Sequence, residues 1–410
     1  MSTSFLYHAF GLPGYDYVRQ EFVGGNILLH VRPKDKLVRC PCCRSRNVLR
    51  RGVSERWLRT VPVGFKPVWL VVEVPRIGCA SCGLVRRIEL RIAEPRRRYT
   101  KAFERFVLAL TKAMTMLDVS RLLGVGWDVV KDILKRHLHK RFAKPSLAGL
   151  EYIAIDEISV RKGHKYLTLV MDLCSGKVIF VGDGRGADSL KPFWERLKRS
   201  RARIRAVATD MSAAYIGSVL EHLPGVAVVL DHFHVVKLMN DRLTEVRRKL
   251  HRELQDKMGK SVLKGSRWIL LKNPESLNPE RQEHERLQEA LEANEPLAKA
   301  YYLKEELRQI WKQPNKAAAA AYLEQWISSA LVSDVGPLVK MGKTMAMYRT
   351  GILAWYDHPI SSGPMEGTNN KIKTLKRQAY GYQDQEFFKL RILEIHEAKY
   401  ALTLTSGSLV

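Results

Sequence analysis

The pattern of hydrophobic and polar positions changes character several times along the chain, and each change predicts a different secondary structure. Residues 1–95 form short β-like runs such as "NILLHV" and "PVWLVVEV" between turn residues. Residues 96–148 switch to helical spacing, and residues 149–240 alternate strand-like and helix-like runs. Residues 241–345 become long charged helices, and residues 346–410 turn basic and helical. We therefore predict five segments with these boundaries.

The segment 149–240 predicts a mixed α/β core. Helices are expected at 189–199 and through "AAYIGSVLEHL", between the strand-like runs "EYIAIDEISV", "KYLTLVMDL", "KVIFVGDG", "RAVATD" and "VAVVLDHF". The helical block 241–345 follows the last of these strands. A length of 410 residues with 46% hydrophobic content allows two to three domains with real cores.

The charge of the chain points to a polyanionic partner. There are 69 Lys and Arg against 42 Asp and Glu, a net charge of +27. Residues 1–150 hold 29 basic and 11 acidic residues, so +18 of that surplus lies in the first third. Basic side chains that neutralise phosphates release counterions and so favour binding. This distribution predicts a nucleic-acid-binding front end.

Membrane partners are not expected from this sequence. No apolar run approaches the ~18–20 residues that cross a bilayer. The N-terminus also lacks a charged region followed by an apolar one, as a secretory signal would have. We therefore expect a soluble, cytoplasmic protein.

Five of the six cysteines are clustered between Cys40 and Cys82. Cys40 and Cys43 form one CxxC knuckle, Cys79 and Cys82 a second, and four thiolates can close a tetrahedron around Zn²⁺. Four cysteine ligands leave no open position, so the predicted role of one Zn²⁺ is structural. Cys42 leaves the ligand choice in the first knuckle open. The alternative is a set of unliganded cysteines in a reducing compartment.

The stretch "TMLDVSRLLGVGWDVVKDILKRHL" (115–138) predicts a helix-turn-helix. A short helix at 118–123 meets a turn at Gly124 and Gly126, and a second helix follows from about Trp127. A helical hairpin inside a core is the alternative. The expected buried stripe is Val130, Ile133, Leu134 and Leu138, and the expected DNA-facing cations are Lys131, Lys135 and Arg136. A basic flank of Arg96, Arg97, Arg98 and Lys101 supports DNA binding.

Two aspartates follow apolar runs in the α/β segment. Asp156 lies in "YIAIDEISV" and Asp210 in "AVATDMS". A carboxylate at the edge of a buried strand is costly unless it has a task. Asp210 could instead cap the following helix, a reading that Ser212 supports. With a third carboxylate, the pair could hold two Mg²⁺ or Mn²⁺ ions for phosphoryl transfer.

Other acids in this segment rank lower as metal ligands. Glu157 is adjacent to Asp156 but points to the opposite face of a strand. Asp172 and Asp183 are explained by turns. In "DHFHVVKL", Asp231, His232 and His234 follow a buried strand; they could bind a metal, but hydrogen-bonded packing beside the active site is favoured.

The third carboxylate is expected in "SSGPMEGTNNKIKTLKRQAYGY" (361–382). With Gly363 as N-cap and Pro364 first in the helix, Glu366 takes the third helical position, where an acid also offsets the helix dipole. Gly367 is unfavourable within a helix unless another backbone, such as DNA, approaches closely. Helical spacing places Glu366, Asn370, Lys373 and Arg377 on one face and Ile372, Leu375 and Ala379 on the other. The cations expected to hold phosphates are Lys371, Lys373, Lys376 and Arg377.

The order of these motifs resembles the DDE transposases, and specifically the bacterial insertion-sequence transposases of the ISL3 type. The similar pieces are "CPCC…CASC", "AIDEIS", "ATDMSAAY", "DHFHVVKLMND" and "PMEGTNNKIKTLKRQAYGY", in order over nearly the whole chain. The resemblance implies a multidomain α/β protein: a zinc-binding β domain (1–95), a helix-turn-helix (96–148), and a ribonuclease H-like mixed-sheet core (149–240 and 346–410) with an all-α insertion (241–345). It also implies that the metal ligands are Asp156, Asp210 and Glu366, and that Asp231 and His234 support them.

By this resemblance, the expected function is DNA transposition. The protein would bind the terminal inverted repeats of an insertion sequence as a homodimer on double-stranded DNA, associated with the nucleoid. Two Mg²⁺ ions would serve hydrolysis at each end and attack of the freed 3′-OH on target DNA. A non-catalytic regulator derived from a transposase, or a nuclease on the same fold, are the alternatives.

Overall fold

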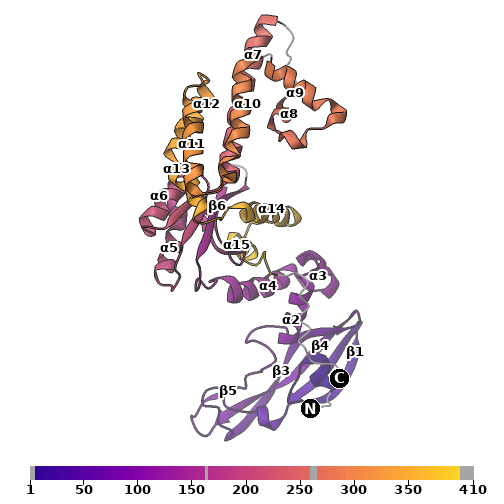
Figure 1. Cartoon of the computed structure of the whole chain (residues 1–410). Helices are drawn as coiled ribbons and strands as arrows, with labels where there is room; N and C mark the ends of the chain where they lie inside the picture. The colour runs from indigo at the N-terminus through magenta and orange to yellow at the C-terminus, as the bar shows by residue number, and fades with distance from the viewer. Residues whose placement is uncertain (1–4, 162–164, 259–265, 293, 398–410) are drawn as a thin grey trace, which may run out of the picture. The chain divides into compact units, whose positions relative to one another are not determined.

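The computed structural model describes residues 5–161, 165–258, 266–292 and 294–397. It contains two compact units: one comprises the described residues up to Arg141 together with Glu397, and the other runs from Phe142 to His396 (Figure 1). These units are coarser than the five predicted segments, whose individual boundaries remain predictions. Within the described ranges, no helix combines the length and the apolar composition that crossing a bilayer requires.

A five-stranded sheet forms the base of the first unit, as the β-like pattern predicted. Its strand order is β1-β2-β4-β3, with β5 paired to the end of β4, and β2 runs parallel to β4. Apolar side chains of one sheet face pack with Phe10 and Leu12 in a single core. The strands are β1 (Tyr15–Val23), β2 (Asn26–Pro33), β3 (Val48–Val63), β4 (Lys66–Cys79) and β5 (Val85–Arg87), with α1 (Phe5–Phe10) before them and a 3₁₀ turn at Asp35–Leu37.

Three helices follow the sheet: α2 (Lys101–Leu110), α3 (Met116–Leu123) and α4 (Trp127–Phe142). The helix α3 begins two residues earlier than predicted, because the hydroxyl of Thr115 accepts a hydrogen bond from the backbone N–H of Asp118. Gly124 ends it with a φ of +59°, which glycine adopts without strain. The predicted helix-turn-helix is therefore confirmed. Its second helix buries the expected stripe of Val130, Ile133, Leu134 and Leu138.

A buried arginine joins the sheet to these helices. Arg59 of β3 is 5% exposed; its guanidinium donates to the carbonyl of Val68 at 3.3 Å and to that of Leu123, the last residue of α3, at 3.1 Å. The guanidinium also lies over the rings of Trp69 and Phe103. Burial lowers the pKa of Arg59. The N-terminal sheet and the helix-turn-helix thus share one packed interface.

The second unit contains a five-stranded mixed sheet with the order β10-β9-β6-β7-β8. β6, β7 and β8 form an antiparallel meander, whereas β9 and β10 run parallel to β6. This is the ribonuclease H-like arrangement that the resemblance implied. The strands are β6 (Tyr152–Arg161), β7 (Lys165–Asp172), β8 (Lys177–Asp183), β9 (Ala206–Thr209) and β10 (Ala227–Leu230).

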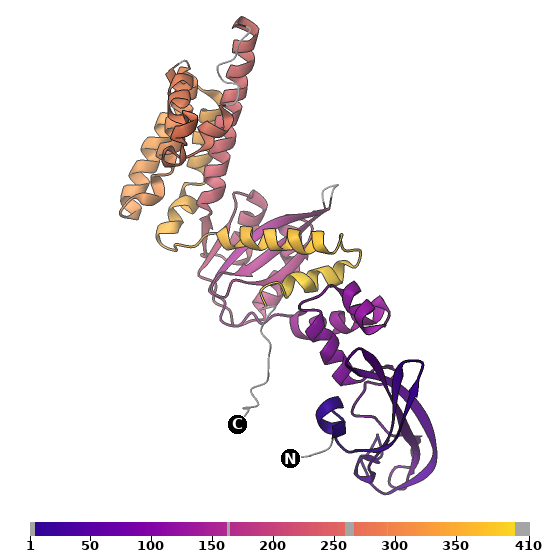
Figure 2. The ribbon, with the colours of Figure 1, turned by 90° about the vertical axis from the view of Figure 1, so that its right-hand side faces the viewer.

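Helices cover both faces of this sheet. Alternate residues of β6 divide between them: Ile153 and Ile155 pack with α5 (Lys191–Lys198) and α6 (Ala213–His222). Ala154 and Ile158 pack with α14 (Gly363–Gln378) and α15 (Gln385–Leu393) on the other face. Figure 2 shows α14 and α15, in yellow, along the same side of the sheet. Side-chain alternation in β6 therefore decides which helices each residue meets.

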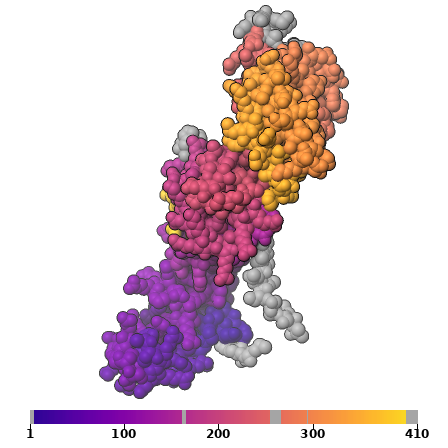
Figure 3. Space-filling view, turned by 60° about the vertical axis from the view of Figure 1, so that its left-hand side comes forward, coloured from indigo at the N-terminus to yellow at the C-terminus, as the bar shows by residue number. Residues whose placement is uncertain are grey.

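The helical insertion builds its own core. Its first helix, α7, begins at His232, directly after β10, so helix replaces strand nine residues before the predicted position 241. Figure 3 shows the orange helices of the insertion next to the magenta core. A Cβ at Gly351 would meet Leu230 at 2.7 Å, so glycine allows this close approach. The helices are α7 (His232–Met258), α8 (Arg267–Leu271), α9 (Glu283–Glu292), α10 (Glu295–Leu307), α11 (Lys316–Leu331), α12 (Gly336–Met347) and α13 (Arg349–Leu353), with 3₁₀ turns at Pro274–Ser276, Pro279–Arg281, Ile310–Lys312 and Ala354–Tyr356.

The helix α14 differs in two details from the prediction. Ser362, rather than Gly363, is its N-cap, so Glu366 takes the fourth helical position. Ala379 was expected on the apolar face, but it is the C-cap of the helix and is exposed. Ile372 is buried as predicted and Leu375 packs partly buried beside it, while Met365 and Thr368 complete the buried face. The predicted polar face is correct, since Glu366 and the residues spaced with it, Asn370, Lys373 and Arg377, are all exposed.

Candidate active site and metal centres

Asp156 and Asp210 meet where two parallel strands separate. Ile155 and Thr209 are the last residues that pair between β6 and β9. Asp156 and Asp210 each occupy the next position in the sequence. Neighbouring strands lie about 4.8 Å apart, which brings the two backbones close at this point. On its other edge, Asp156 is still paired with Leu169 of β7, because β6 continues through Arg161. Asp156 therefore lies within its strand, whereas Asp210 follows the end of β9.

The carboxylate of Asp156 is held by two hydrogen bonds. Its Oδ1 accepts from the backbone N–H of Glu157 at 2.7 Å, and its Oδ2 accepts from Nδ2 of Asn369 at 2.8 Å. Burial raises the pKa of Asp156, and the negative charge of Asp210 adds to this effect. The hydrogen bonds and the nearby His234 oppose it. A cation would relieve the remaining repulsion between the two carboxylates.

Glu157 lies on the opposite face, as predicted. Its carboxylate accepts a hydrogen bond from the hydroxyl of Tyr215 in α6 at 3.2 Å. Asp172 caps its own turn by accepting from the N–H groups of Cys174 and Ser175, and Asp183 pairs with Lys389 at 2.6 Å. These three acids have structural partners away from the carboxylate pair.

Asp210 also forms a local hydrogen bond. Its Oδ1 accepts from the backbone N–H of Ser212 at 3.0 Å, just before α6 begins at Ala213. Only one of its carboxylate oxygens takes part in this bond. Asp210 therefore does not cap α6, because Ser212 is the N-cap of that helix, and its single local hydrogen bond is compatible with a role as metal ligand.

Glu366 belongs to this neighbourhood through the helix that carries it. It lies three residues before Asn369, and residues three apart on a helix are neighbours on its surface. Asn369 contacts Asp156, so the exposed side chain of Glu366 lies one helical turn from that contact, toward the N-terminus of α14. The start of this helix is thus fixed against β6.

Asp231 ties the start of α14 to the end of β10. Asp231 is 2% exposed, and its carboxylate accepts hydrogen bonds from the hydroxyl of Ser362 and from the backbone N–H of Phe233. His234 Nδ1 lies 3.5 Å from its Oδ2. Burial alone would raise the pKa of Asp231, but its contacts with His234, Ser362 and Phe233 outweigh this and lower it. This geometry agrees with the hydrogen-bonded packing favoured from the sequence.

His234 faces three acids. Contact with Asp231 raises the pKa of His234, and the charges of Asp156 and Asp210 raise it further, although burial opposes them. His234 therefore lies within electrostatic reach of the carboxylate pair, as a cation when it is protonated.

The oxygen-rich composition of this site suits Mg²⁺ or Mn²⁺. Among the described residues, the amide Oδ1 of Asn369 is buried beside Asp156 and accepts no hydrogen bond, so it can accept one from a metal-bound water. The carboxylate oxygens of the three acids do not all lie within 4.8 Å of one another. Among the described His, Cys, Asp and Glu residues, only a set of cysteines forms a group that compact. Ligands shared by two cations about 3.5–4 Å apart need not all lie so close.

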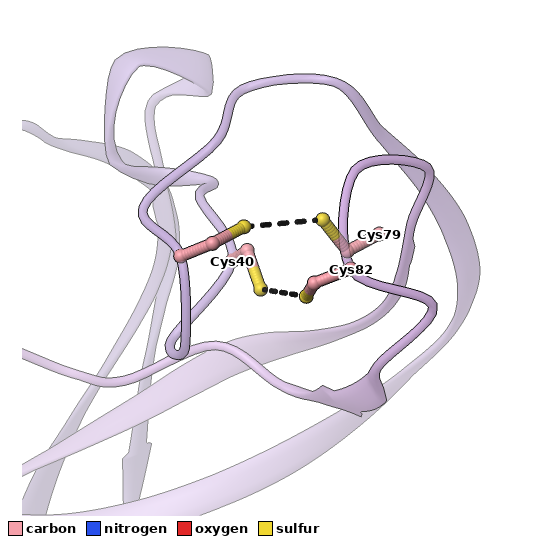
Figure 4. Close-up of side chains that lie close together, drawn as sticks. Cys40, Cys79 and Cys82 are labelled. Carbon is pink, nitrogen blue, oxygen red and sulfur yellow. Dashed lines mark hydrogen bonds between the residues drawn. The ribbon is translucent and has the colours of Figure 1, made fainter.

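That set consists of Cys40, Cys43, Cys79 and Cys82; Figure 4 labels Cys40, Cys79 and Cys82. The sulfurs of Cys40 and Cys82, and those of Cys43 and Cys79, are 3.5 Å apart. Zn–S bonds of about 2.3 Å in a tetrahedron give a similar sulfur spacing. Cys42 is exposed and stands outside the group. The geometry therefore favours the first and last cysteines of "CPCC", which the sequence had left open.

The two knuckles have the same backbone turn. Arg44 N–H donates to the Cys40 carbonyl at 3.0 Å, and Gly83 N–H donates to the Cys79 carbonyl at 2.9 Å. Arg44 and Gly83 both have a positive φ, of 63° and 71°. Each turn directs the two thiols of its knuckle toward the same point, as a tetrahedral metal requires.

The cations predicted to bind DNA in the first unit fall into two groups. Arg96 and Arg98 are exposed, and Lys131 and Lys135 of α4 are half-buried. Arg97 and Arg136 instead form ion pairs, each with Asp132, and Arg136 also pairs with Glu104 at 2.7 Å. Arg97 and Arg136 therefore stabilise the helices, and any phosphate contact would compete with these acids.

The cations of α14 also divide. Lys373, Lys376 and Arg377 line a cleft against the second half of β6. Lys371 is exposed; burial lowers the pKa of His396, and the nearby charge of Lys371 lowers it further. A Cβ at Gly367 would meet no atom within 4 Å, so nothing in the described chain requires glycine there.

Two contributing residues escaped the sequence analysis. The sequence predicted Asn370 rather than Asn369 on the functional face of the helix, because that face was defined by the residues four, seven and eleven positions after Glu366. Counting i+3 as well would have selected it. Ser362 carried no signal, since its partner Asp231 is 131 positions away.

Comparison with known families agrees with this architecture at three places. The DDE transposase model of the ISL3 family, described as "Transposase", matches residues 153–392. The "Helix-turn-helix domain of transposase family ISL3" matches residues 88–138. The "zinc-finger of transposase IS204/IS1001/IS1096/IS1165" matches residues 36–82. A zinc ribbon, a DNA-binding helix-turn-helix and a DDE core define the class as a DDE transposase.

Individual relatives extend the match over nearly the full chain. The transposase for insertion sequence element IS1001 of Bordetella parapertussis is 34% identical over 93% of this chain and 95% of its own. The transposase for IS1557 of Mycobacterium tuberculosis is 30% identical over 88% of this chain and 87% of its own. The Drosophila P element transposase strand transfer complex gives a TM-score of 0.34 and 10% identity over 60% of this chain and 77% of that one. The chain belongs to the ISL3 family of insertion-sequence transposases, and it is a DNA-binding enzyme of DNA transposition.

Proposed function

We propose that this transposase cleaves a phosphodiester at each end of its element and joins the freed 3′-OH to target DNA, using one site formed by Asp156, Asp210 and Glu366. The supporting observation is the hydrogen bond from Asn369 to Asp156, because it places α14, and with it Glu366, against the strand pair that carries the two aspartates. In this proposal the three acids, from β6, from the end of β9 and from α14, act together at one site.

The three carboxylates would hold two Mg²⁺ or Mn²⁺ ions. When bound, the two cations activate the attacking oxygen and stabilise the leaving oxygen in both steps. In the first step the attacking oxygen belongs to water and the leaving group is the 3′ oxygen; in the second, that 3′-OH attacks a target phosphate. The chain's own task is to hold the carboxylates and the DNA in line. Phosphates beside the cleaved bond would contact Asn370, Lys371, Lys373, Lys376 and Arg377.

Recognition of the terminal inverted repeats belongs, in this proposal, to the first unit. The second helix of the helix-turn-helix, α4, would enter the major groove. Arg96, Arg98, Lys131 and Lys135 would contact phosphates, with Arg97 and Arg136 contributing only where DNA replaces their acidic partners. The four clustered cysteines would hold one Zn²⁺ that fixes the end of the β3–β4 hairpin.

Assembly and location follow from the reaction. Two element ends have to be joined to one target, so we propose that the protein acts as a homodimer on DNA. Its substrate places this activity at the nucleoid in the bacterial cytoplasm.

The test compares Asp210→Asn and Glu366→Gln with the wild type, on DNA carrying the inverted repeats that flank the gene, in Mg²⁺. Both variants should bind DNA normally and lose cleavage and joining. Asp183→Asn is the matched control, because it removes a carboxylate from the same sheet at an exposed position. Cleavage by all four proteins would refute the carboxylate assignment. Cleavage without joining would favour a nuclease, and binding alone would favour a regulator.

A further inference from the structure

A cleft runs beside the proposed active site on the same face of the core. It has a volume of about 410 Å³ and lies between the second half of β6 and the C-terminal half of α14. Ile158, Ser159 and Val160 line it, and Ile158 and Val160 lie on the side of β6 that packs against Ile372 and Leu375 of α14. Ile158 is two residues from Asp156, or about 7 Å along the strand.

Apolar, positively charged and aromatic side chains all line this cleft. Ile158, Val160 and Ile372 provide an apolar floor. Lys373, Lys376 and Arg377 supply positive charge along one wall, and among the described residues none of these three forms an ion pair. Tyr380 and Gly381 stand at the end of the helix.

Tyr380 is held at this edge in a conformation that favours glycine. The helix α14 ends with Tyr380 N–H donating to the carbonyl of Arg377 and Gly381 N–H donating to that of Lys376, both at 3.0 Å. In this C-terminal motif the residue at the place of Tyr380 is left-handed and is usually glycine. Tyr380 has a φ of 51°, which is unfavourable for a bulky side chain.

The aromatic ring gains nothing from the protein in return. Tyr380 is fully exposed, and among the described residues its side chain makes no hydrogen bond, ion pair or ring contact. A large apolar ring kept in a strained position, in water, has no role in stability that the structure shows. A ligand that covers the ring would account for it.

We propose that this cleft binds an unpaired nucleotide of the DNA strand next to the cleaved bond, with its base stacked on Tyr380. A base offers a flat apolar face to the ring and to the floor of the cleft, and its phosphates match the three cations. An enzyme that acts at a DNA end can extrude a base when a pocket compensates the lost stacking. This inference rests on the proposed function, because it takes the bound strand to be the one cleaved at Asp156.

The size of the cleft agrees with this ligand. Small-ligand pockets have volumes of about 300–1,000 Å³, and the cleft falls at the lower end of that range. From Asn369 to Arg377 the helix rises by about 12 Å, which corresponds to three or four nucleotides of one strand at 3.4 Å each. The bound nucleotide would thus lie within a few positions of the scissile phosphate.

The test measures binding of the full-length protein without divalent cations, so it does not depend on the carboxylate assignment. Two DNA probes are compared by fluorescence anisotropy: a duplex carrying the flanking inverted repeat, and the same duplex with mismatched nucleotides at the cleavage junction. Tyr380→Gly should lose about 5- to 150-fold in affinity for the mismatched DNA, the range expected for one stacked base. Affinity for the paired DNA should change much less, and Tyr380→Phe should bind both DNAs like the wild type.

Two controls separate stacking from general damage. Tyr302→Ala removes another exposed tyrosine, in the helical insertion, and should bind both probes normally. The thermal midpoint of Tyr380→Gly should equal or exceed that of the wild type, because glycine relieves the strained backbone. Equal affinity of wild type and Tyr380→Gly for the mismatched probe, or an equal loss on both probes, would overturn the proposal. Displacement of the mismatched probe by polyglutamate as readily as by an oligonucleotide would also overturn it, in favour of an acidic peptide.

Discussion

The amide of Asn369 donates a 2.8 Å hydrogen bond to the carboxylate of Asp156, and this bond joins residues 213 positions apart. It fixes one oxygen of Asp156, while the amide Oδ1 of Asn369 is buried and has no hydrogen-bond partner among the residues that the structure describes. Groups that orient a metal ligand commonly matter almost as much as the ligand itself. Asn369 is therefore a positioning residue in the proposed site.

Replacing Asn369 by Ala should lower the rate of DNA cleavage by about 10- to 100-fold, the range typical of residues that orient metal ligands. Without the amide, Asp156 can rotate away from the cations, so the Mg²⁺ concentration needed for half-maximal cleavage should rise. Cleavage rates over a Mg²⁺ titration check this. The control is Thr374→Ala, an exposed residue of the same helix, which should keep the wild-type titration curve. A lower rate with an unchanged Mg²⁺ requirement would contradict the positioning role.

The zinc proposal predicts different outcomes for a clustered cysteine, Cys82, and for Cys42, which lies outside the cluster. Cys82→Ser should lose the metal and lower the midpoint of thermal unfolding, because the four-sulfur cluster loses one member. Cys42→Ser should keep one zinc per chain, since Cys42 stands outside the cluster. Metal analysis of both variants, with thermal unfolding before and after chelation, decides between them. Loss of zinc from Cys42→Ser would mean that the first knuckle uses a different pair.

The contact between His234 and Asp231 should make stability depend on pH. The folded-state pKa of His234 is raised above its ordinary value of 6.5, so its stabilising effect is complete below pH 6.5 and is lost as pH rises through the raised value. The folded-state pKa of Asp231 is lowered below 3.8, so its effect is present above pH 3.8 and is lost as pH falls through the lowered value. The contact between His234 and Asp231 therefore contributes most to the free energy of unfolding between pH 3.8 and pH 6.5.

Urea unfolding of wild type and His234→Gln over a pH series measures this effect. The free energy of unfolding of the wild type should exceed that of the variant by the largest amount between about pH 4 and 6.5. This difference should shrink at higher pH. His139→Gln, at an exposed position of α4, should show no such trend. A difference that is constant with pH would mean that His234 stabilises the protein by packing alone.

The buried Arg59 should be important for the first unit. Arg59→Met removes the donors for the carbonyls of Val68 and Leu123, and leaving a buried acceptor unpaired costs about 1–3 kcal/mol. We expect a loss of stability of that order in denaturant unfolding. Arg51→Met, at an exposed position on the same strand, should be close to neutral. Arg59→Lys should not restore stability, because an ammonium cannot replace the planar fork of the guanidinium.

Much of the fold was predictable because its signals are local. The β-like run "PVWLVVEV" and the helical stripe from Val130 to Leu138 are recognised from side chains close together in the sequence, and both are confirmed. Boundaries were less accurate where a cap decides them. Thr115 and Ser362 each start a helix earlier than the pattern suggested, and the helix α7 begins directly after β10.

The candidate site was predictable in composition but not in its connections. The sequence by itself determined that Asp156 and Asp210 follow apolar runs, that Glu366 stands alone among cations, and that two CxxC knuckles are present. Only the tertiary structure decided that Asn369 rather than Asn370 contacts Asp156, that Ser362 meets Asp231, and that Cys42 is excluded. It also decided that Arg136 pairs with acids of its own chain. Spacing along a chain fixes which face of an element a residue occupies, but the partner of that face depends on how distant elements pack.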